Sequence, residues 1–560
     1  MRLLFTNARL VDGTGAPARE GSLLVEDDHI AELGETSLSP DEVIDCSGAV
    51  LCPGFIDMHS HGDFALPRDR DAAAKVMQGV TTEVVGNCGL GVFPANDVVA
   101  SFYARLSPML FGEESGGSDG GTFRDLDAFR ARLDDGGASV NTAPLVSHGN
   151  VRAHAMGLEE RQASPGELRA MEELVDRAHA QGAFGLSTGL VYPPGAYAET
   201  DEIIALARVA ARHGGIYTTH MRDEGARLIP SFEEALRVGR EAKISVQISH
   251  HKAGGRFNWG KVKKTLAMLE RAREQGMDVH SDVYPYTAGS TVLSAMFLPL
   301  WAFEGSQEKL LERLGDPVMR ARMTRDAEER FMRFVHLPGI LDRIFPKRLI
   351  LPWVLRELSK VVVVSSTKNE HRYEGMSIAD IVKERGKPLF EVLFDLLKEE
   401  ELAVAAIAHV MSEDDVRTVM KHPSTMIGTD GFPQREGKPH PRTYGTYPRV
   451  LEEYVKKERL FSLETAIHKM TAMPASKLGL SDRGVLREGA IADLVVLRPS
   501  DVHDRSSYAD PRQHPDGIAH VMVGGVFTVK NGAHTGARPG RVLSRTISAR
   551  TRGERVEGRS

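Results

Sequence analysis

Cysteine is scarce in this sequence, and long apolar runs are missing from it. Only three of the 560 residues are cysteine, which is too few and too unevenly spaced for a disulfide framework. No segment approaches the roughly 18 consecutive apolar residues of a membrane-spanning helix, and residues 1–7 lack the apolar core of a secretion signal. These absences argue against a secreted or membrane-spanning protein, and we expect a cytoplasmic one.

The sequence also lacks an excess of charge of one sign. Its 70 lysines and arginines stand against 77 aspartates and glutamates, and both signs are mixed along most of the chain. We therefore expect neither nucleic acid nor a membrane as a partner, since both attract basic surfaces. The chain is 41% hydrophobic and 26% charged, as in globular proteins with a large core. We expect a small-molecule ligand and leave a homo-oligomer open.

A nucleotide-binding glycine motif is absent too, although apolar strands alternate with amphipathic helices through the middle of the chain. Candidate strands lie at residues 79–85, 143–147, 185–187, 216–219, 244–248 and 424–427. Repeated strand–helix units predict a parallel sheet, and about eight of them predict a closed barrel. A doubly wound open sheet is the rival architecture, but no Gly-x-Gly-x-x-Gly after a strand supports it.

Both ends of the chain consist of short alternating strands separated by glycine turns. We therefore predict that residues 1–52 and 476–540 form two parts of one β-sandwich. The barrel domain, at 53–475, is inserted between these two parts. Residues 297–360 break the strand–helix rhythm with Leu- and Arg-rich helices, which predicts a helical excursion that packs on the barrel or forms a lid. Residues 541–560 are rich in arginine and poor in large apolar groups, which predicts a flexible tail.

A His-x-His pair, His59 and His61, ends the first expected barrel strand. Alternation along the strand places both imidazoles on one face at its carboxyl end, where barrel active sites lie. The pair alone is weak evidence, because 21 histidines in 560 residues give about one such pair by chance.

Cys88 follows the next strand, in a Gly-Asn-Cys-Gly turn at residues 86–89. The glycines open the backbone and expose the sulfur toward the barrel mouth, although a free cysteine is often only a small buried hydrophobe. A soft thiolate beside imidazoles suits Zn²⁺. His220 and His250 end two later strands and would complete such a site. Alternation does not choose between His250 and the adjacent His251.

Asp430 closes the last expected barrel strand, in a Gly-Thr-Asp-Gly sequence. An Asp-Gly pair is well suited to a turn, which is the purely structural interpretation. A carboxylate at this place can also accept a proton from an activated water and return it to a leaving nitrogen. The residues therefore predict a metallohydrolase with Asp430 as the proton-transfer group.

Taken together, these motifs resemble the N-acyl-D-amino-acid deacylase (D-aminoacylase) family of the amidohydrolase superfamily. The His-x-His motif marks the superfamily, and the Gly-Asn-Cys-Gly turn marks this branch. The remaining motifs are Thr-His-Met-Arg at 219–222, Ile-Ser-His-His-Lys at 248–252, Asp-Val-Tyr-Pro-Tyr at 282–286, Gly-Thr-Asp-Gly at 428–431 and Pro-His-Pro-Arg at 439–442. The resemblance covers nearly the whole chain, from about residue 3 to residue 545.

The resemblance implies a fold and a reaction. The fold is α/β, a distorted TIM-type (β/α)₈ barrel with a small β-sandwich domain built from both termini. The reaction is the zinc-dependent hydrolysis of the amide bond of N-acyl-D-amino acids to a carboxylate and a free D-amino acid.

The resemblance also implies the metal ligands. A tight zinc belongs to the positions of Cys88, His220 and His250, and a weaker second metal belongs to the His-x-His pair, with Cys88 bridging. Many relatives in the superfamily bridge two metals through a carboxylated lysine on a middle strand. Residues 185–190 contain no lysine, so Cys88 takes the bridging role.

Substrate-binding residues follow from the same resemblance. Lys252 and Tyr284 match positions that hold the substrate carboxylate, and Tyr192 and Ser290 look similar. Arg372 is a further candidate anion clamp. The structural alternatives are a solvated lysine and simple ring packing.

Other functions stay open on this evidence. A cyclic amidase or dihydroorotase-like hydrolase and an L,D-dipeptidase could use the same barrel and metal. A non-enzymatic scaffold would be indicated by the loss of a ligand or of Asp430, and none of these residues is missing.

Overall fold

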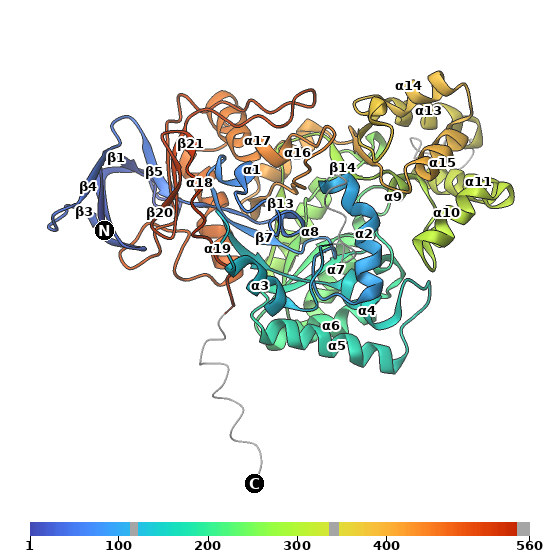
Figure 1. Ribbon diagram of the computed structural model, residues 1–560, viewed down its shortest axis with the longest axis horizontal. Coiled ribbons are helices and arrows are strands. Elements are labelled where there is room, and N and C mark those ends of the chain that lie inside the picture. Colours follow the sequence, from blue (N-terminus) through green and yellow to red (C-terminus); the bar gives the residue numbers. More distant parts are fainter. Residues whose placement is uncertain (112–120, 335–346, 546–560) are drawn as a thin grey trace, which may run out of the picture.

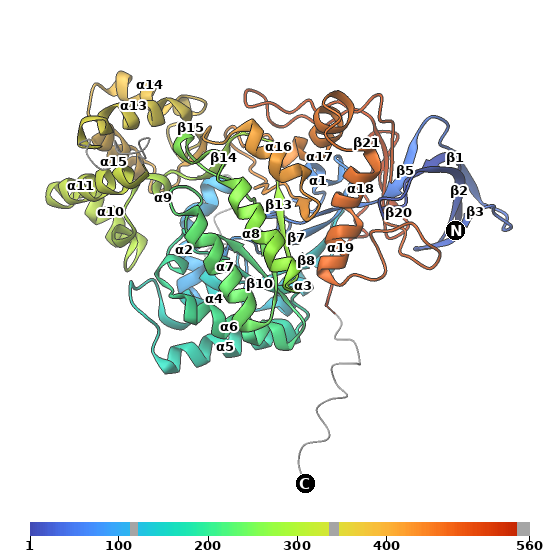
Figure 2. The same ribbon diagram turned by 180° about the vertical axis from the view of Figure 1, so that it is seen from behind.

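The computed structural model describes residues 1–111, 121–334 and 347–545. Along the longest axis, a sheet of antiparallel and parallel strands lies at one end, a body of parallel strands and helices in the middle, and a mostly helical segment at the other end (Figure 1). The reverse view shows the same arrangement (Figure 2). The class is α/β, as predicted. Within the described residues, no helix combines the length and apolarity needed to cross a membrane.

Both ends of the chain contribute strands to the sheet of antiparallel and parallel strands at one end of the molecule. Its nine strands follow the order β21-β20-β19-β18-β5-β1-β2-β3, with β4 paired to β1. The two halves meet where β5 pairs antiparallel with β18. The strands are β1 (Arg2–Leu10), β2 (Arg19–Glu26), β3 (His29–Gly34), β4 (Glu42–Asp45), β5 (Val50–Pro53), β18 (Leu494–Leu497), β19 (Ile518–Val523), β20 (Val526–Lys530) and β21 (Ala533–His534).

The middle of the molecule contains two parallel sheets, with strand orders β6-β7-β8 and β17-β13-β12-β11-β10-β9. Every pairing in both sheets is parallel, so the carboxyl ends of neighbouring strands meet at one edge. The strands are β6 (Phe55–Asp57), β7 (Val80–Val85), β8 (Asn141–Pro144), β9 (Val146–Ser147), β10 (Gly185–Gly189), β11 (Ile216–His220), β12 (Ser245–Ile248), β13 (Val279–Val283) and β17 (Thr425–Ile427). The predicted strands at 79–85 through 424–427 are confirmed.

Further contacts join the outer strands of these two sheets. A parallel bridge pairs Ser60, beyond β6, with Gly431, beyond β17. The buried carboxylate of Asp57 accepts hydrogen bonds from Lys75 Nζ at 2.6 Å and from Thr429 Oγ1 at 2.7 Å. At the other side, β8 and β9 are separated by the single residue Leu145.

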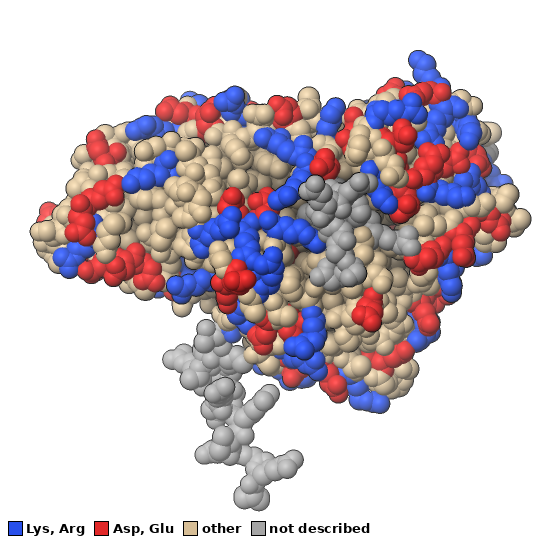
Figure 3. Space-filling view, in the orientation of Figure 1, with Lys and Arg blue, Asp and Glu red and all other residues tan. Residues whose placement is uncertain are grey.

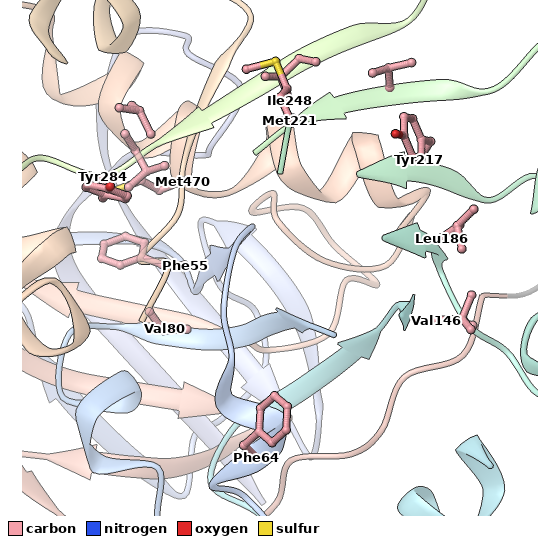
Figure 4. Close-up of a cluster of buried hydrophobic side chains, with 14 of the residues drawn as sticks. Phe55, Phe64, Val80, Val146, Leu186, Tyr217, Met221, Ile248, Tyr284 and Met470 are labelled. Atoms are coloured by element: carbon pink, nitrogen blue, oxygen red, sulfur yellow. The ribbon is translucent and has the colours of Figure 1, made fainter. Parts of the chain in front are cut away.

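Amphipathic helices cover these strands and bury their apolar stripes against them. Helix α5 (Pro165–Ala180) is typical, because Ser164 and Glu167 form a capping box at its start and Met171 and Val175 are fully buried. Figure 4 shows buried side chains from five different strands in this core, Val80, Val146, Leu186, Tyr217 and Ile248. The other covering helices include α4 (His148–Met156), α6 (Thr200–Arg212), α7 (Leu228–Ala242), α8 (Val262–Glu274), α16 (Glu413–Lys421) and α18 (Leu463–Met470).

The excursion predicted at 297–360 is longer than expected and includes strands. It runs from β14 to β16 and contains a three-stranded antiparallel sheet of order β14-β16-β15. A separate group of buried side chains, among them Phe297, Leu393 and Phe394, forms its core. Its described elements are β14 (Gly289–Val292), α9 (Leu293–Phe297), η5 (Leu300–Phe303), α10 (Gln307–Gly315), α11 (Pro317–Phe334), η6 (Lys347–Leu349), α13 (Leu351–Val361), β15 (Val362–Ser366), η7 (His371–Tyr373), α14 (Ile378–Arg385), α15 (Leu389–Glu399) and β16 (Ala405–Ala408).

The first residues of the predicted flexible tail, 541–545, pair with the rest of the fold. Backbone hydrogen bonds join Arg541 and Leu543 to Thr142 of β8 at 2.9 and 2.8 Å, and Arg545 to Gly182 at 3.0 Å. The cause is local, because Val542 and Leu543 are adjacent apolar residues whose burial stabilises this segment on the fold. Val542 is only 7% exposed. The rest of the predicted tail, 546–560, lies outside the described residues.

Charges of both signs are spread over the visible surface, with uncharged areas between them (Figure 3). Figure 3 shows acidic and basic side chains interspersed over most of this face, with one group of lysines and arginines near its centre. The pattern agrees with the near balance of 70 basic and 77 acidic residues.

Candidate metal centre

The predicted ligands and proton-transfer group converge at the carboxyl ends of the parallel strands. They are His59 and His61 after β6, Cys88 after β7, His220 at the end of β11, His250 after β12 and Asp430 after β17. In one group, ligand atoms of His59, His61, Cys88 and Asp430 lie within 4.8 Å of one another; in a second group, those of Cys88, His220 and His250 do. All six are buried. Cys88 is therefore common to two potential metal sites.

The backbone at three of these residues takes the left-handed conformation that L-residues usually avoid. The φ angles are 55° at Cys88, 34° at His250 and 48° at Asp430. Such conformations cost about 1–3 kcal/mol each and concentrate at functional sites. The positive φ at His250 also explains why strand alternation could not choose between the two histidines. The neighbouring His251 lies away from the centre and bonds to Thr265 Oγ1 at 2.7 Å.

The distances between the ligand atoms suit a tetrahedral zinc ion. Cys88 Sγ lies 3.2 Å from His59 Nε2 and 3.4 Å from His250 Nε2. With Zn–S at about 2.3 Å and Zn–N at about 2.0–2.1 Å, sulfur and nitrogen ligands of one tetrahedral ion lie about 3.5 Å apart. A thiolate with imidazoles is also the donor set that zinc prefers. The residues therefore fit the metal that the sequence predicts.

The surroundings of Cys88 favour its thiolate. Burial would raise the pKa of this thiol, but the imidazoles of His59 and His250 and a hydrogen bond from His220 outweigh burial and hold the pKa well below its usual range. The thiolate is the form that binds metals. The sulfur is therefore ready to act as a ligand.

Asp430 lies between the first histidine pair and a buried arginine. Its Oδ1 is 3.4 Å from His59 Nε2 and 3.3 Å from His61 Nε2, and its Oδ2 is 2.7 Å from an Arg442 nitrogen. Burial would raise the pKa of Asp430, but the charge of Arg442, followed by those of the histidines, holds it well below the usual range. Asp430 is thus kept as a carboxylate that can accept a proton.

Glu224 and Arg442 were not among the predicted site residues. Glu224 Oε1 lies 2.8 Å from Lys252 Nζ and 2.9 Å from His250 Nδ1, and its Oε2 lies 3.3 Å from His220 Nε2. Carboxylates commonly orient metal-binding histidines in this way. The sequence feature that could have identified Glu224 is its position four residues after His220. The feature that could have identified Arg442 is the Pro-His-Pro-Arg motif.

A cavity of about 280 Å³ opens over the metal centre, and four of the five predicted substrate-binding residues line it. These four are Lys252, Tyr284, Tyr192 and Ser290. Lys252 Nζ lies 6.0 Å from the centre of the Tyr284 ring, and the Tyr192 hydroxyl bonds to Thr291 Oγ1 at 3.0 Å.

Arg372 does not reach the cavity. It lies in the short helix η7 of the excursion, its side chain is 63% exposed, and its guanidinium pairs with Glu370 and Glu384. Arg442, in contrast, lines the cavity, with its guanidinium 4.7 Å from the centre of the Tyr284 ring. The structure therefore offers Arg442, rather than Arg372, as the arginine of the site.

The rest of the cavity wall is largely apolar. The lysines and arginines among the described lining residues are Lys252 and Arg442, and both are ion-paired. The excursion supplies one part of the apolar wall and the central body the other. The apolar lining residues include Phe64, Leu90, Phe102, Leu158, Val292, Met296, Phe303, Leu310, Leu402 and Phe432.

Gly189 gives the Cys88 turn the space that it needs. A Cβ at Gly189 would lie 1.9 Å from the backbone oxygen of Cys88, which no Cβ can tolerate. We expect Gly189→Ala to displace the turn and lower the zinc content of the purified protein, as measured by elemental analysis. Gly166→Ala is the matched control, because its nearest neighbour would lie at 3.9 Å. Equal zinc content in both variants would contradict the close approach.

The chain is similar to known proteins in both sequence and structure. The model of the amidohydrolase family matches residues 42–529. A D-aminoacylase from Alcaligenes xylosoxydans xylosoxydans is 38% identical over 548 residues, which cover 98% of each chain. A crystal structure of N-acyl-D-glutamate deacylase from Bordetella bronchiseptica, complexed with zinc and a phosphonate mimic of the tetrahedral intermediate, matches with a TM-score of 0.80 and 34% identity. It covers 97% of this chain and 99% of that chain. A D-aminoacylase structure described by its binuclear metal centre matches with a TM-score of 0.80, 36% identity and the same coverage.

Proposed function

The chain belongs to the amidohydrolase family, and we propose that it hydrolyses the amide bond of N-acyl-D-amino acids with bound zinc, releasing a carboxylate and a free D-amino acid. The observation that carries the proposal is the sharing of Cys88 between two groups of buried ligands, with Asp430 beside them. Relatives named as D-aminoacylase and N-acyl-D-glutamate deacylase align over nearly the whole chain. We propose one tight zinc at Cys88, His220 and His250 and a weaker second metal at His59 and His61.

We also propose that the parallel strands form a distorted (β/α)₈ barrel. Counting β8 and β9 as one interrupted strand, eight strands follow in order from β6 to β17. The bridge between Ser60 and Gly431 supports closure of the ring. The sheet from both chain ends would then be the sandwich domain, built from residues 1–52 and 476–540, and residues 53–475 would be the barrel domain.

The proposed reaction divides the work between metal and side chains. Bound zinc would supply two things: polarisation of the acyl carbonyl and a water nucleophile that is active near neutral pH. Asp430 accepts the proton of the attacking water and then donates it to the nitrogen of the leaving amine. Arg442 keeps Asp430 ionised until the first of these transfers, and Lys252 and Tyr284 hold the α-carboxylate of the substrate.

A substrate panel tests this function. N-acetyl-D-amino acids should be hydrolysed, while their L-forms, hydantoins and L,D-dipeptides should react more slowly by orders of magnitude. Rates are measured with the purified, zinc-loaded protein by detection of released amine. Preference for a hydantoin would favour a cyclic amidase, and preference for an L,D-dipeptide would favour a dipeptidase.

The cavity wall favours apolar D-side chains over acidic ones. A D-aspartyl or D-glutamyl substrate would bring a second carboxylate, and the two cations of the described lining already pair with Glu224 and Asp430. Burying an unpaired carboxylate costs several kcal/mol. We expect kcat/KM for N-acetyl-D-methionine or N-acetyl-D-leucine to exceed that for N-acetyl-D-aspartate by about 100-fold or more. Comparable values for both classes would contradict this assignment.

A further inference from the structure

Asp282 of β13 contacts both groups of metal ligands, although it belongs to neither. Its side chain is buried, with the residue 1% exposed. Asp282 Oδ1 lies 3.1 Å from His59 Nδ1 and accepts a hydrogen bond from the backbone nitrogen of His250 at 2.7 Å. Asp282 Oδ2 accepts a hydrogen bond from Gln247 Nε2 at 2.9 Å. One carboxylate oxygen therefore serves one histidine from each group.

The strand register brings Asp282 to this place. Strand β13 lies between β12 and β17, and Ser281 pairs with Ile248, the last residue of β12. Asp282 is the next residue of β13, so it lies beside the segment that leads from the end of β12 to His250. Its own backbone oxygen accepts a hydrogen bond from the nitrogen of His251 at 2.8 Å. The contact follows from the sheet itself and needs no flexible loop.

At His59, Asp282 determines which ring nitrogen is free. An ionised carboxylate accepts a hydrogen bond, so the proton of the neutral imidazole lies on Nδ1 and the lone pair on Nε2. His59 Nε2 is the atom 3.2 Å from Cys88 Sγ and 3.4 Å from Asp430 Oδ1. A carboxylate on the far nitrogen also raises the basicity of a metal-binding imidazole.

At His250, Asp282 holds the backbone instead of the ring. The left-handed φ of 34° at His250 turns its imidazole toward Cys88, with Nε2 3.4 Å from Sγ. A hydrogen bond from the His250 nitrogen to an ionised carboxylate helps to offset the cost of this conformation. Loss of the bond would free the backbone to relax and move the ring.

We propose that Asp282 is a positioning residue whose charged carboxylate links the two metal sites, through the hydrogen bonds that set the tautomer and basicity of His59 in one and hold the backbone of His250 in the other. The proposal rests on the metal-dependent function proposed above. It makes the two sites interdependent, so that one substitution outside the ligand set weakens both.

The Asp282→Asn variant separates positioning by charge from simple filling of space. The amide oxygen of asparagine can keep both hydrogen bonds of Oδ1, and its NH₂ group would face Gln247. The Oε1 atom of Gln247 is buried and has no partner among the described residues, so Gln247 can turn its amide and accept from the new NH₂. The variant therefore keeps the shape of the site and loses the charge.

Zinc titration of the metal-free protein, followed by competition with a chromophoric chelator, is the direct test. We expect Asp282→Asn to weaken both zinc-binding steps by about 10–100-fold, the usual effect of removing a group that orients a metal ligand, while the melting temperature of the metal-free protein stays close to that of the wild type. Wild-type affinity at both steps, or weakening at only one, would overturn the link. Asp278→Asn is the matched control, because Asp278 lies just before β13 and pairs with Lys477 and His280 outside the metal centre.

A second variant keeps the test informative if Asp282→Asn does not fold. Gln247→Met removes only the hydrogen bond to Asp282 Oδ2, and we expect a smaller weakening at both zinc-binding steps; wild-type affinity would overturn the proposal. Because the titration uses no substrate, its result does not depend on which amide the enzyme hydrolyses. A protein that binds two zinc ions but cleaves no N-acyl-D-amino acid would refute the proposed function and leave the test of Asp282 valid.

Discussion

A Cys88→Ala variant should lose zinc and amide hydrolysis together. Cys88 is the one residue shared by both ligand groups, so its removal takes a ligand from each possible metal position. Removing residues that merely orient ligands costs about 10–100-fold in affinity, and we expect the loss of this direct ligand to exceed that range. Metal content per chain and kcat/KM, measured on the same preparation, check the result.

Another cysteine, Cys52, provides the control for this experiment. Cys52 is buried in β5, where burial raises the pKa of its thiol, and it belongs to neither ligand group. Cys52→Ala should cost a little stability through the small cavity left behind and keep both zinc and activity. Retention of tight zinc and full turnover by Cys88→Ala would show that the ligand assignment is wrong.

The Asp430→Asn variant should keep the tight zinc and lose most of its turnover. The second ligand group, Cys88 with His220 and His250, does not include Asp430. An amide cannot accept the proton of the attacking water, and the loss of a general base or acid typically costs about 10²–10⁴-fold in rate. We expect kcat to fall by that amount, while zinc content stays near one ion per chain.

Stability must be measured alongside this variant. Asparagine leaves the buried guanidinium of Arg442 without its counter-charge, which costs about 3–5 kcal/mol when a buried pair is broken. Asp504→Asn is the control, because Asp504 approaches a different arginine, Arg449, at 3.9 Å and does not line the cavity. Substantial turnover by a folded, zinc-loaded Asp430→Asn protein would remove Asp430 from the proton-transfer role.

Local patterns allowed much of the central fold to be predicted from the sequence. Apolar runs bounded by turn residues identified β7, β10, β11, β12 and β17, and the residue after a strand predicted where a functional side chain would lie. Strand β13 was absent from the strands predicted by periodicity, because its Val-His-Ser-Asp-Val sequence interrupts the apolar pattern. Strands β14 and β15 of the excursion were missed for a different reason. Each of them pairs antiparallel with β16, across segments that have helical sequence patterns.

The residues of the two candidate ligand groups could be predicted from the sequence, whereas the residues that contact and support them could not. His59 and His61 share a strand end and a spacing, which are local features. Asp282 reaches His59 from 223 residues away, and no periodicity or spacing rule reports such a contact. Arg372 and Arg442 were indistinguishable as candidate anion-binding arginines, because burial and ion pairing depend on the tertiary fold.

The pairing of β5 with β18 has a consequence for synthesis on the ribosome. Strand β5 directly precedes β6, and the first two proposed metal ligands follow within a few residues. All four residues of β5 pair with β18, which lies more than 400 residues further along the chain. Domains generally fold as units as they emerge, but here the strand that supports the earliest proposed ligands is translated long after them. A nascent chain truncated before β18 would therefore expose one edge of β5, and the support of the metal centre would be completed only after β18 has emerged from the ribosome.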